Sequence, residues 1–219
     1  MLSYRHAFHA GNHADIFKHT VLSLIIKKMS EKEKPFTFFD THAGAGCYDL
    51  DDERALKTGE AQCGIQKLLS LPEDTIPQEM KLYTDLCRAY YSREMYPGSP
   101  EIERCLMRKD DALILCELHN TEIEVLKNNM ELAVLYRGIA RQNTADSILN
   151  FETVHPQIHH RSGYEALIAL TPPKIKRGGA VIDPSFEEKS DFSDAAQTIA
   201  SVHKKWNTGV IMLWYPLLA

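Results

Sequence analysis

The sequence predicts an α/β protein built on a doubly wound, mainly parallel sheet. Short runs of β-branched, aromatic and other apolar residues alternate with longer segments in which apolar residues recur at helical spacing. At 219 residues the chain can bury one sizeable core, so we expect a single domain over 1–219 that carries an insertion. The expected strands lie at 36–39, 112–116, 138–142, 180–183 and 210–214.

Composition and charge limit the partners of the chain. It is 44% hydrophobic and 25% charged, and its formal net charge is −5. This balance argues against a protein that coats nucleic acid through its overall field, but it leaves room for a local basic face. Candidates for such a face are Arg5, Lys18, Lys27, Lys28, Lys174, Lys176, Arg177 and Lys189.

The cysteines and the N-terminus indicate the compartment. The 5 cysteines are odd in number and none is two residues from another, which favours reduced thiols over a disulfide framework or a zinc knuckle. The N-terminus is polar and rich in histidine, and no apolar run approaches the length of a membrane span. We therefore expect a cytoplasmic protein without a membrane partner. We also expect a monomer.

The first helix follows an arm of mixed aromatic, cationic and imidazole residues over 1–13. Apolar residues recur at helical spacing from Ala14 onward, Asn12 and Asp15 form a cap-like start, and Pro35 follows the end. The arm can be a solvated tail or a lip that contacts substrate. Lys18 and His19 lie one turn into the helix.

The strand at 36–39 leads into the loop Asp40-Thr41-His42-Ala43-Gly44-Ala45-Gly46. Small residues at such a position let a ligand approach the backbone, as in nucleotide-binding folds. The loop lacks both the Lys-Ser/Thr ending of a phosphate-binding loop and the third glycine of a dinucleotide fingerprint. An NTPase or a dehydrogenase is therefore disfavoured.

Residues 49–95 interrupt the alternation of strands and helices with charged residues and helical patterns. We interpret this segment as a small helical insertion at the rim of the sheet where ligands bind; the alternative is a further pair of helices in the layers. Tyr96-Pro97-Gly98-Ser99-Pro100 then predicts a turn and a helix start, with Ser99 as the cap. A helix N-terminus can also receive an anionic group.

The strand at 112–116 is followed by Glu117, an acid placed where Rossmann-like proteins bind ribose hydroxyls. A helical pattern resumes after it. His155, His159 and His160 lack a partner at ligand spacing, so we assign them to a solvated loop and predict no metal. Ser162 and Gly163 open a short helix.

The most informative stretch is Ala180-Val181-Ile182-Asp183-Pro184-Ser185-Phe186. It predicts a buried strand that ends in a carboxylate, a rigid turn with a free carbonyl, and an aromatic ring. These groups suit the binding of a flat ring that carries an amine.

Several of these motifs together resemble the bacterial 23S ribosomal RNA adenine-N6 methyltransferase family, also described as competence-related proteins for use of external DNA. The resemblance spans nearly the whole chain. It rests on the arm and first helix, on the loop at 40–46, and on the motifs Tyr96-Pro97-Gly98-Ser99-Pro100, Glu117-Leu118-His119, Asp183-Pro184-Ser185-Phe186 and Trp214-Tyr215-Pro216.

The resemblance implies a Rossmann-like class I methyltransferase that uses S-adenosylmethionine and acts on ribosomal RNA, protein-free or partly assembled. It implies Asp183 as the catalytic acid/base, with Pro184 and Phe186 holding the adenine. The implied substrate contacts are Tyr4, Arg5, His6 and Lys18. The implied cofactor contacts are His19, His42, Gly44, Ser99, Glu117, Ser162, Gly163 and Asp183.

The chain departs from the family pattern at three places. Ser162 stands where the family has an acid, with Asp146 and Ser147 as a possible substitute, and Phe186 stands where the family has tyrosine. Family members also continue through further strands, so we expect C-terminal strands of the sheet to be missing. Two alternatives stay open: a nucleic-acid-binding protein without catalysis, linked to the use of external DNA, and a DNA adenine-N6 methyltransferase.

Overall fold

The computed structural model describes the backbone of residues 5–143 and 154–217, and the side chains of 5–131 and 154–217. Its centre is a fully parallel five-stranded sheet in the order β5-β4-β1-β6-β7. The strands are β1 (Thr37–Asp40), β4 (Ala112–Glu117), β5 (Gln157–His160), β6 (Gly178–Ile182) and β7 (Val210–Leu213). The predicted doubly wound α/β class is confirmed.

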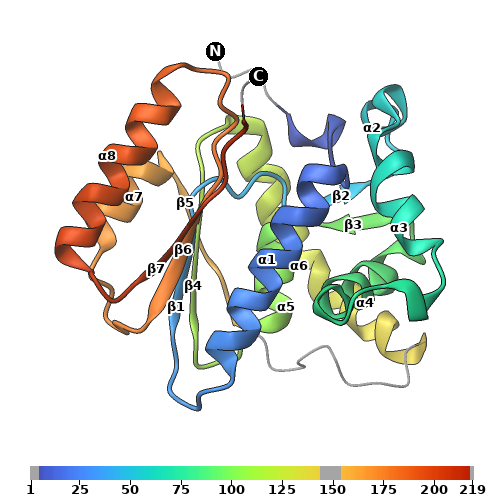
Figure 1. Cartoon of the computed structure of the whole chain (residues 1–219), viewed down its shortest axis with the longest axis horizontal. Helices are drawn as coiled ribbons and strands as arrows, with labels where there is room; N and C mark the ends of the chain where they lie inside the picture. Colours follow the sequence, from blue (N-terminus) through green and yellow to red (C-terminus); the bar gives the residue numbers. More distant parts are fainter. Residues whose placement is uncertain (1–4, 144–153, 218–219) are drawn as a thin grey trace.

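Helices cover both faces of the sheet (Figure 1). One face carries α1 (His13–Ser30), α5 (Ser99–Leu106) and α6 (Asn120–Asn143), and the other carries α7 (Gly163–Leu170) and α8 (Ser190–Lys205). Successive strand residues point to opposite faces. Phe38 accordingly packs in the core under α1 and α6, whereas Phe39 packs in the core under α7 and α8.

The chain direction sets where a ligand can bind. From the central β1 the chain moves outward to β4 and β5, then returns to the other side of β1 for β6 and β7. The switch point therefore lies between β1 and β6, and ligands of open α/β sheets bind at the carboxyl ends of the strands next to such a point. Asp40 is the last residue of β1, and Asp183 directly follows β6.

The segment between β2 (Cys47–Asp49) and β3 (Met95–Pro97) is helical, and these two strands pair antiparallel at its base. It lies beyond α1, on the side away from the sheet (Figure 1). Its elements are α2 (Glu53–Thr58), a π-helical turn Gln62–Gln66, α3 (Lys67–Leu69), two 3-10 turns at Glu73–Thr75 and Gln78–Met80, and α4 (Lys81–Tyr91).

Two predictions about strands and loops were wrong. Residues 138–142 belong to α6 and form no strand; the helical repeat that begins at Ile123 continues through them, and extending a helix costs less than starting a new element. The third strand outward is β5, which includes His159 and His160, so these are not in a loop. β5 has little apolar pattern because it is an edge strand, formed by pairing with β4.

Residues 5–12 are positioned by the start of α1. Asn12 caps the helix, and its side chain accepts a hydrogen bond from Asp15 N at 2.9 Å, as predicted. Before it, His6–Phe8 forms a 3-10 turn, η1. Within the described residues, no helix is both long enough and apolar enough to cross a membrane.

Candidate active site

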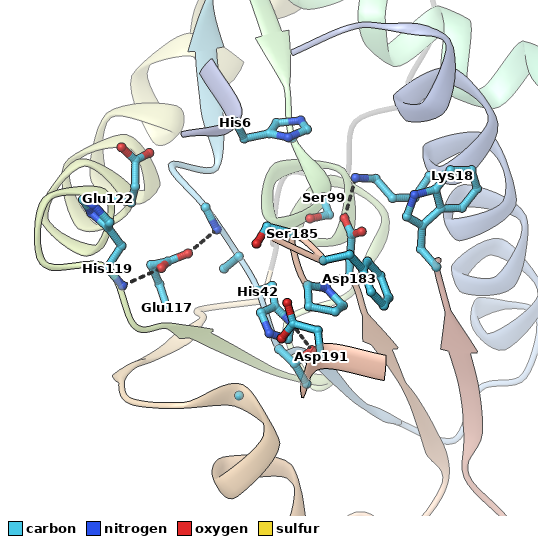
Figure 2. A pocket seen from close by; sticks show the side chains of 18 of the residues that line it. His6, Lys18, His42, Ser99, Glu117, His119, Glu122, Asp183, Ser185 and Asp191 are labelled. Atoms are coloured by element: carbon cyan, nitrogen blue, oxygen red, sulfur yellow. Dashed lines mark hydrogen bonds and ion pairs between the residues drawn. The ribbon is translucent and has the colours of Figure 1, made fainter. Parts of the chain in front are cut away.

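A cavity of about 310 Å³ opens at the carboxyl ends of β1, β4 and β6, where the switch point lies (Figure 2). The lining brings together residues from distant parts of the sequence. Among them are 12 of the residues implied by the family resemblance: His6, Lys18, His19, His42, Gly44, Ser99, Glu117, Ser162, Gly163, Asp183, Pro184 and Phe186.

Asp40 connects two walls of this cavity. One carboxylate oxygen accepts a hydrogen bond from His42 N at 3.0 Å, and the other accepts one from Ser99 Oγ at 2.6 Å. The carboxyl is fully buried, and burial raises its pKa to about 6. The prediction that Ser99 caps α5 was therefore wrong. The cap residue is Gly98, and the Ser99 hydroxyl donates to Asp40 instead.

His42 is held in one orientation. The Thr41 hydroxyl donates to Val181 O at 3.0 Å and lies 2.8 Å from His42 Nδ1. Burial lowers the pKa of His42 to about 4, so the imidazole is neutral at pH 7. A neutral imidazole has one donor and one acceptor nitrogen, so His42 can exchange one hydrogen bond with Thr41 and one with a ligand.

Glu117 closes the cavity at the end of β4. Its carboxylate accepts from Gly44 N at 2.8 Å and from His119 N at 2.7 Å (Figure 2). Burial raises its pKa above the usual value. Gly44 has φ +58°, and a Cβ there would lie 2.4 Å from the Tyr48 hydroxyl, so only glycine brings its N–H to Glu117 without strain.

Lys18 joins α1 to the loop between β6 and α8, residues 183–189, which we call the Asp183 loop. Its ammonium lies 2.5 Å from Asp183 Oδ2 (Figure 2). It also lies 3.1 Å from Asp15 Oδ1. Burial favours the neutral amine, but these two carboxylates outweigh it and raise the pKa of Lys18 above its usual value. Lys18 is therefore a buried cation that restrains one oxygen of Asp183.

Asp15 in turn restrains the arm. It accepts from Gly11 N at 2.9 Å and lies 2.9 Å from His6 Nε2. Burial alone would raise its pKa, but His6 and Lys18 outweigh that effect and hold the pKa well below its usual value. The arm, α1 and the Asp183 loop thus form one electrostatic unit.

His19 is oriented from the helical segment. Its Nδ1 lies 2.7 Å from the Tyr96 hydroxyl, which lies 3.0 Å from the Tyr83 hydroxyl on α4. Burial lowers the pKa of His19 to about 3, so this ring is also neutral. The chain of side chains connects α4 and β3 to the cavity wall.

The Asp183 loop holds its aromatic ring in an uncommon conformation. Phe186 has φ +55°, the left-handed region, which is rare for an aromatic residue and tends to occur at functional sites. Its ring lies 4.6 Å from that of Phe192 on α8. Pro184, between Asp183 and this residue, also lines the cavity.

The start of α7 packs against the loop after β1. Ser162 caps α7, with Glu165 N donating to its side chain. A Cβ on Gly163 would lie only 1.9 Å from Thr41 O, so close packing accounts for this glycine without a ligand. Asp146 and Ser147, the possible substitutes for the missing acid, lie outside the described residues.

Two implied substrate contacts are not placed in the cavity. Arg5 is exposed, precedes η1 and is not among the lining residues, while Tyr4 lies outside the described residues. Sequence reasoning missed Asp15 and Asp40 as site residues, although an acid at the end of a strand was a usable signal for Asp40. The described residues contain no group of three or more His, Cys, Asp or Glu side chains suited to a metal ion.

Comparison with known proteins identifies the family. Residues 33–219 match the family model described as ribosomal RNA large subunit methyltransferase D, RlmJ. The chain is 40% identical over 222 residues to ribosomal RNA large subunit methyltransferase J of Escherichia coli, and 36% identical over 221 residues to the protein of that name from Haemophilus influenzae. Each alignment covers 100% of this chain and 71% of the relative.

A solved structure supports the same assignment. The crystal structure of a Legionella pneumophila protein superimposes with a TM-score of 0.79 at 31% identity, covering 95% of this chain and 70% of that one. The family resemblance inferred from the motifs is thereby confirmed: the chain belongs to the RlmJ family of ribosomal RNA large subunit methyltransferases.

Proposed function

We propose that this chain transfers a methyl group from S-adenosylmethionine to the exocyclic N6 amine of an adenine in 23S ribosomal RNA. One observation carries the proposal: Asp183, Pro184 and Phe186 lie in the same cavity as Glu117 and the loop after β1. The residues that can hold an aromatic amine, at 183–186, thus share a cavity with the residues that can hold the nucleoside of the methyl donor, Glu117 and the loop after β1. The names of the relatives, ribosomal RNA large subunit methyltransferase J, support the substrate class.

The lining residues fit S-adenosylmethionine. Glu117 lines the cavity at the end of β4, where Rossmann-like proteins bind ribose hydroxyls, and the small residues at 43–46 allow a ligand close to the backbone. The volume, about 310 Å³, lies at the lower end of the range of small-molecule sites. The lining is also acidic, which suits a positively charged sulfonium; its acids are Asp15, Glu117, Glu122, Asp183, Glu188 and Asp191.

The methyl donor's part, when bound, is to supply an electrophilic methyl group. The chain's part is to hold the adenine amine, whose lone pair is delocalised into the ring. Lys18 occupies Asp183 Oδ2, so Asp183 Oδ1 and the Pro184 carbonyl remain to accept the two amine hydrogens. Accepting them returns electron density to the nitrogen and orients it, and positioning of this kind is the main contribution to rate.

Proton release completes the transfer. The methylated nitrogen carries one extra proton, which passes to Asp183 or to water. Lys18, held as a cation by Asp15 and Asp183, restrains the Asp183 carboxylate through Oδ2. Phe186 offers a ring face against which an unpaired adenine can stack.

The decisive experiment is Asp183→Asn, which keeps the shape but removes the charge. We expect no methylation of protein-free 23S ribosomal RNA by mass spectrometry, at a temperature where circular dichroism shows the variant to be folded, because Lys18 loses one of its two partners and the thermal midpoint should fall. Asp74→Asn, the same change on the exposed 3-10 turn Glu73–Thr75, is the control and should methylate like the unmodified chain. Retained turnover by Asp183→Asn would refute the assignment, as would failure of the unmodified chain to bind S-adenosylmethionine in a calorimetric titration.

We also propose that the substrate is RNA that is protein-free or partly assembled, and that the enzyme is a monomer. An adenine must leave its stack to reach Asp183, and RNA that is protein-free or partly assembled allows this more readily than a finished subunit. We expect faster methylation of the free transcript than of assembled large subunits, no turnover on DNA, and a monomer in sedimentation. Such a substrate would place the enzyme in the cytoplasm.

A further inference from the structure

The motif Trp214-Tyr215-Pro216 has no part in the chemistry described above, yet Trp214 and Pro216 line the cavity. Trp214 directly follows β7, and its backbone N–H donates to Ile182 O at 3.0 Å. Ile182 is the residue before Asp183. The end of β7 therefore holds the indole beside the Asp183 loop.

Phe17, on α1, contacts this indole. Because Lys18 reaches Asp183, helix α1 lies against the same loop, and the neighbouring Phe17 is carried to Trp214. The two ring centroids are 5.8 Å apart, with the ring planes tilted by 50°. Phe17 is nonetheless 63% exposed. We call Phe17 and Trp214 the aromatic pair.

We propose that the aromatic pair stacks the base of an unpaired nucleotide adjacent to the target adenine, so that the RNA substrate is single-stranded over at least two successive nucleotides. The inference rests on the proposed function and extends it to the form of the RNA. An exposed aromatic ring in contact with a tryptophan offers the face on which single-stranded nucleic acids stack.

Charge favours a base as the occupant. Within the described residues, the cavity lining carries six carboxylates, and its one lysine, Lys18, is already paired with two of them, so this rim disfavours a phosphate more than a neutral base. A neutral base can approach this rim, and ring faces provide affinity that does not depend on phosphate. Phe186 offers a face for the target adenine within the cavity, and the aromatic pair offers a second face at the β7 side.

The test uses the unmodified chain, an eight-nucleotide oligoadenylate and an RNA hairpin whose stem is fully paired and closed by a short, structured loop. The chain has 2 tryptophans, and Trp206 is 2% exposed, so quenching of emission by added RNA reports on Trp214. We expect quenching by oligoadenylate and little by the hairpin. Trp214→Phe should lose the quenching but keep most of the affinity, because a ring face remains.

Phe17→Ala should bind oligoadenylate about tenfold more weakly, as expected for the loss of one base–aromatic stack. It should raise KM for 23S ribosomal RNA by a similar factor, while its affinity for S-adenosylmethionine stays unchanged. Leu56→Ala is the control: Leu56 is 52% exposed on α2, away from the cavity lining, and its loss should change neither value.

Three results would overturn the aromatic pair as a base-stacking site. The first is that Phe17→Ala binds oligoadenylate as tightly as the unmodified chain. The second is that Phe17→Ala loses affinity for the hairpin by the same factor as for oligoadenylate. The third is that Phe17→Ala melts at a much lower temperature but keeps its RNA binding, which would mean that protein covers the pair. Failure of the proposed function would differ, since the unmodified chain would then bind no S-adenosylmethionine and methylate no RNA.

Discussion

Replacing Lys18 with methionine tests whether the first helix controls the Asp183 carboxylate. Methionine keeps most of the apolar stem but removes the ammonium that lies 2.5 Å from Asp183 and 3.1 Å from Asp15. The lysine side chain is 7% exposed and that of Asp15 is 1% exposed, so water cannot replace the lost partner. Asp15 becomes a buried charge with less compensation.

The expected cost follows from this geometry. Removing one partner of a buried ion pair costs about 3–5 kcal/mol, and a chain of this size loses about 2–4 °C of thermal midpoint per kcal/mol. We therefore expect Lys18→Met to lower the midpoint by at least about 6 °C at pH 7. The double variant Asp15→Asn/Lys18→Met should recover part of this loss, because it also removes the stranded charge.

The pH dependence gives an independent readout. The lowered pKa of Asp15 means that this carboxylate stabilises the fold above the unfolded-state pKa near 4, and the contribution is lost as pH falls. The difference between Lys18→Met and the unmodified chain should therefore be largest at neutral pH and shrink toward about pH 3.

The control for this experiment lies on the same helix. Lys28 is 79% exposed and pairs with Glu31 at 2.8 Å, so Lys28→Met should change the unfolding free energy by less than about 1 kcal/mol. Thermal and urea denaturation followed by circular dichroism measure both variants. If Lys18→Met melts within 2 °C of the unmodified chain, as we expect of Lys28→Met, the buried pair does not hold the loop.

Three further changes test the rest of the site. Tyr96→Phe removes the hydroxyl 2.7 Å from His19 Nδ1, so calorimetry should show S-adenosylmethionine binding weakened by about 1 kcal/mol, roughly fivefold; unchanged affinity would contradict an orienting role. Asp40→Asn removes a carboxyl whose raised pKa destabilises the fold as pH rises from about 4 to 6. Over that range, the unfolding free energy of the variant relative to the unmodified chain, measured by urea denaturation, should rise by on the order of 2 to 3 kcal/mol. A difference that stays constant with pH would contradict the raised pKa. Gly163→Ala places a Cβ 1.9 Å from Thr41 O, and the melting temperature should fall by several degrees; a neutral effect would show that α7 can shift freely.

The missed strand and helix have one physical origin. The run 138–142 is compatible with either type of element, and only its continuity with the helix that starts at Asn120 decides the matter. β5 has no strong periodicity of its own and exists because Leu115 and Cys116 of β4 offer backbone partners to Ile158 and His159. Pairing between segments some 40 residues apart cannot be read from local pattern.

The sequence by itself determined the class of fold and the edge of the sheet that carries the site. Apolar runs that alternate with helical periodicity require parallel strands, and parallel strands bring their terminal acids, Asp40, Glu117 and Asp183, to one edge. The sequence is sufficient here because each strand and helix is marked by its own local pattern, and a helix between two strands makes those strands parallel.

Only the tertiary structure decided which side chains pair at that edge. Lys18 is separated from Asp183 by 165 positions, and Ser99 from Asp40 by 59, and each pair forms because a helix packs on the sheet at one particular angle. The same packing brings Phe17 to Trp214. Contacts of this kind depend on how helices and strands fit together in three dimensions, and no local pattern in the residues encodes that fit.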